Sequence, residues 1–154
     1  MRALVARVNK ADVFVGEDLY ASIPKGIALF VNIEKNDDDS VLEEMAEKVM
    51  NLRIFEGENE KLNYSIKDKN YAVLCIPNFT LLASVKKGRR PSFEEAASKE
   101  NACLLFNNFF ILLTARSTNV RKAAFGEHMN INLTCDGPVN IIIDIKKQAI
   151  THKT

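Results

Sequence analysis

The sequence is poor in the residues from which most catalytic and metal sites are built. Its 154 residues include two histidines, three cysteines and no tryptophan. No Ser-His-Asp, Cys-His or HExxH arrangement can be drawn from His128 and His152, and neither GxGxxG nor a GxxxxGKS/T phosphate loop is present. We therefore expect that, if this protein is an enzyme, it uses no familiar side-chain triad, no metal and no cofactor.

The cysteines, the net charge and the apolar runs exclude further kinds of site and classes of protein. Cys75, Cys103 and Cys135 form no CxxC pair for zinc or redox chemistry, and reduced thiols fit the cytoplasm. The net charge is +1, so any attraction to a polyanion must come from a local patch. No apolar run reaches the roughly 18 residues of a membrane helix, and residues 2–8 do not resemble a signal peptide. These absences predict a cytoplasmic protein with no membrane partner.

The composition fits a globular domain with a single core. Hydrophobic residues make up 47% and charged residues 27% of the chain. No repeat, low-complexity tract or Pro/Gly/Ser-rich linker divides it. We expect one domain over residues 1–146 and a short basic tail over residues 147–154.

The first half of the chain predicts strands followed by a helix. Apolar residues on both sides of residues 9–12 indicate a hairpin there, and the apolar run 27–33 suits a strand buried on both faces. Ser40 and Glu43 have capping-box spacing, which predicts a helix start. The apolar residues that follow recur at helical spacing and form one stripe: Val41, Leu42, Met45, Ala46, Val49 and Met50.

The second half continues the mixed order. Residues 71–76 form a short apolar strand, residues 92–95 a second capping pattern that would open a short helical turn, and residues 101–114 a second long helix. Residues 129–134 alternate as in a half-buried strand, residues 136–138 break it, and residues 141–143 begin another. This order predicts an α+β fold with two main helices and a largely antiparallel or mixed sheet.

Two short segments are candidates for a site. Residues 77–81, Pro-Asn-Phe-Thr-Leu, place polar groups between two apolar runs, where Asn78 and Thr80 would present amides and side chains at a sheet rim. Residues 136–139, Asp-Gly-Pro-Val, form a turn in which Gly137 and Pro138 would touch a ligand with main chain alone. Taken singly, each is explained better as a strand-to-turn junction or a tight turn.

A third feature is a short basic run that precedes Pro91. Its cations, Lys86, Lys87, Arg89 and Arg90, stand out in a nearly neutral chain. They form either a phosphate-binding loop or an ordinary solvated surface loop.

In their order along the chain, these features resemble the D-aminoacyl-tRNA deacylase family. The similarity runs from residue 1 to about residue 145 and includes residues 3–8 (Ala-Leu-Val-Ala-Arg-Val), 88–93 (Gly-Arg-Arg-Pro-Ser-Phe) and 125–129 (Phe-Gly-Glu-His-Met). The family's two signature motifs correspond to residues 78–81 and 136–139. Each match is weak, but the ordered set is specific.

The resemblance implies a homodimer that hydrolyses the ester between a D-amino acid, or glycine, and the 3′ end of tRNA. Phe79 and Thr80, together with Asn78, would form the amino-acid pocket, and the amides of this segment would stabilise the attacked carbonyl. Gly137 and Pro138 of the other subunit, joined by a cis bond, would exclude L side chains. Further substrate contacts would come from Arg7, which orients the Gly-Pro pair, and from Phe125, Gly126 and Met129.

The departures from the family pattern leave two other functions open. Pro77 and Asn78 stand where the family has Ser-Gln, Cys135 and Asn140 replace an asparagine and a threonine around the second motif, and Ala123 replaces a glycine. One alternative is a non-catalytic relative that binds the tRNA end. The other is editing of L-alanine mischarged on tRNA, since that related branch resembles this chain at Pro77 but has a trans Gly-Pro bond.

Overall fold

The computed structural model describes residues 1–58 and 61–147, so all of the expected basic tail except Lys147 lies outside the described residues. The chain folds into one α+β unit, as predicted. Its elements are β1 (Arg2–Val15), β2 (Asp18–Ile23), β3 (Gly26–Asn32), α1 (Asp39–Asn51), β4 (Phe55–Glu56), β5 (Leu62–Tyr64), α2 (Ile66–Lys69), β6 (Ala72–Pro77), the 3-10 helix η2 (Phe79–Leu82), α3 (Lys99–Thr114), β7 (Val120–Lys122) and β8 (Met129–Asp144).

The main sheet is mixed and is organised around the long strand β1. Its strand order is β2-β1-β3-β6-β7, and β8 pairs with β1 along almost its whole length. The first half of β1 also pairs antiparallel with β3, and its second half pairs with β2. The pairs β3–β6 and β6–β7 are parallel. The carboxyl ends of β3 and β6 therefore lie together at one edge of the sheet.

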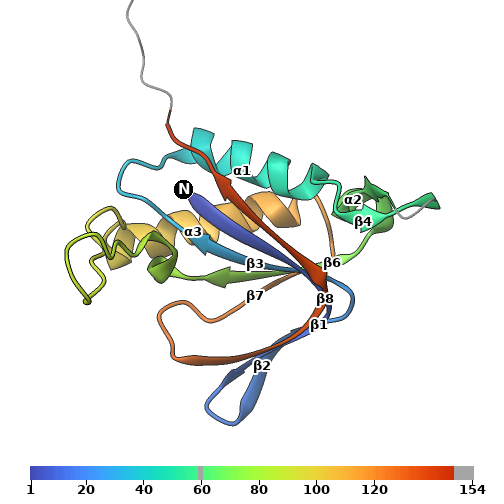
Figure 1. Cartoon of the computed structure of the whole chain (residues 1–154), viewed down its shortest axis with the longest axis horizontal. Coiled ribbons are helices and arrows are strands. Elements are labelled where there is room, and N and C mark those ends of the chain that lie inside the picture. Colours follow the sequence, from blue (N-terminus) through green and yellow to red (C-terminus); the bar gives the residue numbers. More distant parts are fainter. Residues whose placement is uncertain (59–60, 148–154) are drawn as a thin grey trace, which may run out of the picture.

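The core lies on both faces of the central strands. In Figure 1, α1 and α3 lie side by side over one face, while β2 and half of β8 curve beneath the other. The whole predicted stripe of α1 is buried against the sheet. A second cluster fills the opposite face, where Ala28 and Leu74 meet Val13 and Ile23. The apolar runs of β3 and β6 are thus explained, because both of their faces are buried.

Two predictions about turns are wrong. Residues 9–12 are not a hairpin: β1 runs through them, and the chain turns only after Val15. Asn9 and Lys10 are exposed where the pairing of β1 with β8 shifts register, so their polarity marks an irregularity in the strand. Likewise, residues 136–138 do not break the final strand, because β8 continues through them, with a second register shift opposite residues 6–8 of β1.

The two capping predictions are also wrong in detail. The side chain of Asp38, not Ser40, caps α1, since it accepts hydrogen bonds from the amides of Ser40 and Val41. Ser92 opens no helix, because its amide and carbonyl both pair with Ser84. α3 begins only at Lys99, and Ser98 caps it by accepting from the amide of Asn101.

Cys75 should be unreactive in the folded protein. It lies in β6, fully buried, and burial raises the pKa of its thiol far above the ordinary value. We expect a thiol reagent to modify all three cysteines in concentrated guanidinium but to leave Cys75 unmodified under native conditions. Mass spectrometry of the digested protein would check this. Rapid native labelling of Cys75 would mean that β6 is not held in the core.

Candidate active site

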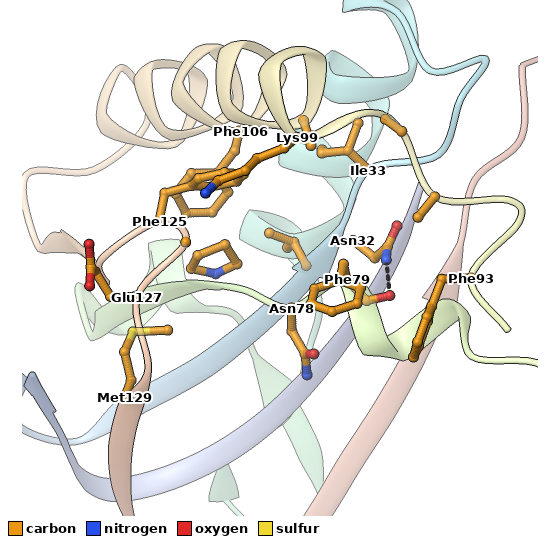
Figure 2. Close-up of a pocket in the computed structure, with 16 residues that line it drawn as sticks. Asn32, Ile33, Asn78, Phe79, Phe93, Lys99, Phe106, Phe125, Glu127 and Met129 are labelled. Atoms are coloured by element: carbon orange, nitrogen blue, oxygen red, sulfur yellow. Dashed lines mark hydrogen bonds between the residues drawn. The ribbon is translucent and has the colours of Figure 1, made fainter. Parts of the chain in front are cut away.

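A pocket of about 550 Å³ opens at the edge where β3 and β6 end (Figure 2). Such edges, at the carboxyl ends of parallel strands, commonly form ligand sites. The ends of the two strands form the floor, the N-terminal turn of α3 covers one side, and residues 125–129 close another. Most of the lining is apolar or aromatic: Val31, Ile33, Pro77, Phe79, Phe93, Ala96, Ala97, Ala102, Phe106, Phe125 and Met129.

The first predicted segment turns sharply at this edge. β6 ends at Pro77, and the Asn78 amide then donates to the carbonyl of Val31 at 2.8 Å. The Asn78 side chain accepts from the Thr80 amide at 3.2 Å and from the Thr80 hydroxyl, which starts η2. Phe79 is the first residue of this short helix, so its own amide has no partner within the helix. This amide is a candidate donor to a ligand.

The aromatic side of the pocket is built by Phe79 and Phe93. Phe79 is 60% exposed, and its ring meets that of Phe93 edge to face, with the centroids 5.0 Å apart. Phe93 follows the basic run, and the backbone pairing of Ser84 with Ser92 closes the loop between them. Phe93 was not predicted as a site residue, although it belongs to the 88–93 match.

Asn32 is a second residue that sequence reasoning missed. It is 1% exposed at the end of β3, and its Nδ2 donates to the carbonyl oxygen of Phe79 at 2.5 Å (Figure 2). Its Oδ1 is buried and has no hydrogen-bond partner among the described residues. The signal was visible, since Asn32 is the one polar residue within the apolar run 27–33.

Two charged side chains line the pocket and were also not predicted. Lys99, at the start of α3, extends over the pocket near Phe125, and Glu127 lies on the segment between Phe125 and Met129 (Figure 2). Within residues 1–58 and 61–147, neither forms an ion pair, and no group of three or more His, Cys, Asp or Glu side chains is placed to hold a metal ion. The pocket therefore offers backbone amides, aromatic faces and isolated charges.

The second predicted segment, residues 136–139, lies away from this pocket. Gly137 and Pro138 are exposed in the middle of β8, are joined by a cis peptide bond and do not line the pocket. In Figure 1 the bend of β8 lies at the other end of the sheet from η2, the yellow-green turn after β6. The cis geometry is the one that the resemblance implies. Asn78, Phe79, Phe125, Gly126 and Met129 meet at the pocket, whereas Thr80, Gly137 and Pro138 do not line it.

Arg7 fixes the backbone next to the Gly-Pro pair. It is buried in β1, where its Nε donates to the carbonyl of Asp136 at 3.0 Å and an Nη donates to the carbonyl of Ile54 at 2.8 Å. Carboxylate oxygens of Asp136 and Glu56 lie 3.4 Å from the same guanidinium. Arg7 thus ties the middle of β8 to the segment that follows α1.

Replacing Arg7 by methionine should lower the free energy of unfolding by about 2–4 kcal/mol, because one buried and one partly buried carbonyl lose a charged donor. Urea titration followed by circular dichroism would measure this. The matched variant Arg121→Met, at an exposed arginine of β7, should change stability by less than about 0.5 kcal/mol. Equal effects of the two changes would show that the Arg7 contacts contribute nothing specific.

The basic run forms an exposed loop near the pocket. Lys86, Lys87, Arg89 and Arg90 lie between the paired residues Ser84 and Ser92, just before Phe93. None of them takes part in an ion pair within the part of the chain that the structure describes. The loop is therefore a free positive surface beside the aromatic wall.

Comparisons with known proteins agree on one family. The family model described as D-Tyr-tRNA(Tyr) deacylase matches residues 4–144. Relatives named D-aminoacyl-tRNA deacylase from Thermotoga petrophila and Finegoldia magna are each 42% identical to this chain, over 96% of it and 99% and 100% of their own lengths.

Two solved structures share the fold. One, titled c-Myc DNA Unwinding Element Binding Protein, is 36% identical with a TM-score of 0.90, covering 96% of this chain and 100% of its own. The other, titled a probable eukaryotic D-amino acid tRNA deacylase, is 16% identical with a TM-score of 0.82, covering 94% and 98%, and bears on the fold alone. Within the described residues, no helix is long and apolar enough to span a membrane.

Proposed function

This chain belongs to the D-Tyr-tRNA(Tyr) deacylase family, and we propose that it hydrolyses the ester bond of D-aminoacyl-tRNA, releasing the D-amino acid and tRNA as a proofreading step of translation. The observation that carries this proposal is the pocket at the ends of β3 and β6, where the family's first motif presents a helix-start amide beside aromatic walls. Glycine mischarged on the alanine tRNA is a further substrate, since it has no side chain to exclude.

The pocket favours catalysis by positioning and charge stabilisation. The Phe79 amide is placed to donate to the oxyanion that forms when the ester carbonyl is attacked, whereas the amides of Asn78 and Thr80 already have partners. The ester lies beside the terminal ribose hydroxyl, and the protein holds both in the reactive arrangement. The terminal adenosine lies against Phe125 and Gly126.

The stereochemical filter comes from a second copy of the chain. Gly137 and Pro138 are exposed, held at Asp136 by Arg7 and remote from their own pocket, so each pocket is complete only when a partner inserts this pair. A main-chain wedge excludes an L side chain by collision and leaves a D side chain room to point outward. Specificity of this kind requires no recognition of the side chain.

The free cations of the basic loop are the proposed contacts to tRNA phosphates. Lys86, Lys87, Arg89 and Arg90 lie beside the pocket's aromatic wall, where the acceptor end would enter. Phosphate contacts of this type add affinity without reading sequence.

Incubation with D-tyrosyl-tRNA, glycyl-tRNA and L-alanyl-tRNA tests the proposal. We expect release of D-tyrosine and glycine and no release of L-alanine. Thin-layer chromatography of the labelled amino acid would measure this release. Hydrolysis of L-alanyl-tRNA alone would assign the chain to editing of L-alanine. Retained tRNA binding with no hydrolysis of any substrate would make it a non-catalytic relative.

A further inference from the structure

We infer that Asn32 is a positioning residue of the reaction: its side-chain amide holds the peptide between Phe79 and Thr80 and so helps to orient the Phe79 amide toward the substrate carbonyl. This inference rests on the proposed function and adds a residue from outside the signature motifs. Its basis is the 2.5 Å contact between Asn32 Nδ2 and the Phe79 carbonyl oxygen, which joins β3 to η2 across 47 residues of sequence.

The peptide that Asn32 contacts is held from both sides. Its carbonyl oxygen belongs to Phe79 and accepts from Asn32, while its N–H belongs to Thr80 and donates to the Asn78 side chain at 3.2 Å. The two asparagines together leave this peptide little freedom to rotate. The Phe79 amide belongs to the preceding peptide. It lies between this held peptide and the Asn78 amide, which donates to Val31, so its direction is limited from both sides and it remains available to a ligand.

Stability alone does not account for an asparagine at this position. Asn32 is 1% exposed in an otherwise apolar strand, and its Oδ1 is buried without a partner among the described residues, which costs free energy of folding. The bond to the Phe79 carbonyl is partly buried and offsets only part of this cost. An apolar residue would suit the fold better, so the benefit of Asn32 lies in orienting η2.

The hydrogen bond also acts on the strength of neighbouring donors. A carbonyl that accepts a hydrogen bond polarises its own peptide, so the N–H of Thr80 becomes a better donor to Asn78. Asn32 therefore supports the cap that starts η2 as well as the orientation of the Phe79 residue. Loss of the Asn32 side chain should weaken the stabilisation of the transition state and leave substrate binding nearly unchanged.

Asn32→Asp and Asn32→Leu are the informative variants. Ionised aspartate has the shape of asparagine but no donor, whereas protonated aspartic acid regains an O–H that can donate to the Phe79 carbonyl. Burial raises the pKa of such a carboxyl, so the protonated form is present on the acidic side and is lost as the pH rises. Leucine has no donor at any pH.

We expect kcat on D-tyrosyl-tRNA to fall about tenfold in both variants near pH ~8, with KM within about twofold of the unchanged protein. As the pH falls toward ~5, the kcat of Asn32→Asp divided by the kcat of the unchanged protein should rise severalfold. The same ratio for Asn32→Leu should stay constant. Asn36→Asp adds the same charge at an exposed turn and should match the unchanged protein throughout. A pH-independent Asn32→Asp ratio, or a loss confined to KM, would overturn the inference.

Two further measurements separate the possible failures. If the unchanged protein hydrolyses no aminoacyl-tRNA, the proposed function fails; if it does so and the Asn32 variants match it, only the inference fails. If the variants do not fold, an NMR measurement on the unchanged protein still tests the inference. The sample is the unchanged protein with a bound phosphonate analogue of the D-aminoacyl ester. We expect NMR to detect a scalar coupling between Asn32 Nδ2 and the Phe79 carbonyl carbon in this complex. Absence of the coupling would refute the positioning role.

Discussion

Alanine at position 26 is expected to destabilise the fold more than any other single change considered. A Cβ on Gly26 would lie 1.9 Å from the carbonyl oxygen of Ala72 and 2.8 Å from its amide nitrogen. Both are backbone atoms of the paired strand β6, so relief would require β3 and β6 to separate. We expect Gly26→Ala to lose at least about 4 kcal/mol, a large part of the roughly 5–15 kcal/mol typical of a domain.

Urea unfolding followed by circular dichroism would measure this loss, with Gly16→Ala as the matched control. Gly16 lies in the turn after β1, where an added Cβ would meet open space and only a φ of 61° opposes a side chain. That change should cost about 1 kcal/mol. If Gly26→Ala cost no more than Gly16→Ala, the close parallel pairing of β3 with β6 would be wrong.

The elements that could be predicted from the sequence are those with a clear period. The stripe of α1 was predicted residue for residue, because a helix with one buried face repeats its apolar positions at a fixed spacing. β3 and β6 were predicted because strands buried on both faces are continuous apolar runs. The α+β class and the mixed sheet followed from their order.

Local polarity misled the prediction where tertiary pairing decides the backbone. Asn9 and Lys10 look like turn residues, yet they lie inside β1, which β8 holds extended. At the start of α1, both Asp38 and Ser40 carry a suitable oxygen, and the sequence alone does not say which one meets the free amides. Ser92 has capping spacing, but its backbone is committed to Ser84.

The site was only partly predictable for a similar reason. Asn78, Phe79 and Phe125 were identified through the family's motifs, and the pocket brings them together. Asn32 and Lys99 have no motif, and they join the site only because β3 ends beside β6 and α3 begins over that edge. Contacts between distant segments of this kind follow from the assembled fold.

Alanine at position 137 is expected to abolish most activity while preserving the fold. A Cβ on Gly137 would lie 2.5 Å from the amide nitrogen of Val139, and its φ of 137° is one that L side chains rarely adopt. The backbone of β8 must therefore change course at this point, which misplaces Pro138. Because a shift of about 1 Å in a positioning group can cost about 100-fold, we expect kcat/KM on D-tyrosyl-tRNA to fall by about that factor.

The fold should tolerate this change, since Gly137 is exposed, and the melting temperature should fall by only a few degrees. Asn132→Ala, at an exposed position of the same strand, is the control and should keep full activity. If Gly137→Ala stayed within about twofold of the unchanged protein, the exposed Gly-Pro pair would not be part of the catalytic site.

Mixing Gly137→Ala with Phe79→Ala should restore activity that neither variant has alone. Phe79 is 60% exposed, so its truncation removes a pocket wall with little effect on folding. In the proposed homodimer, a mixed pair would bring the intact wedge of the Phe79→Ala chain to the intact pocket of the Gly137→Ala chain, while the other site would carry both defects. Random assortment after joint refolding makes half the dimers mixed, each with one working site of two, so about a quarter of the activity of the unchanged protein should return.

Gly137→Ala mixed with Pro138→Ala should regain nothing, because both wedges are altered. Mixed dimers that form by native mass spectrometry but stay inactive in the first pairing would place the wedge and the pocket of each site in the same chain. That outcome would contradict the separation of Gly137 and Pro138 from their own pocket.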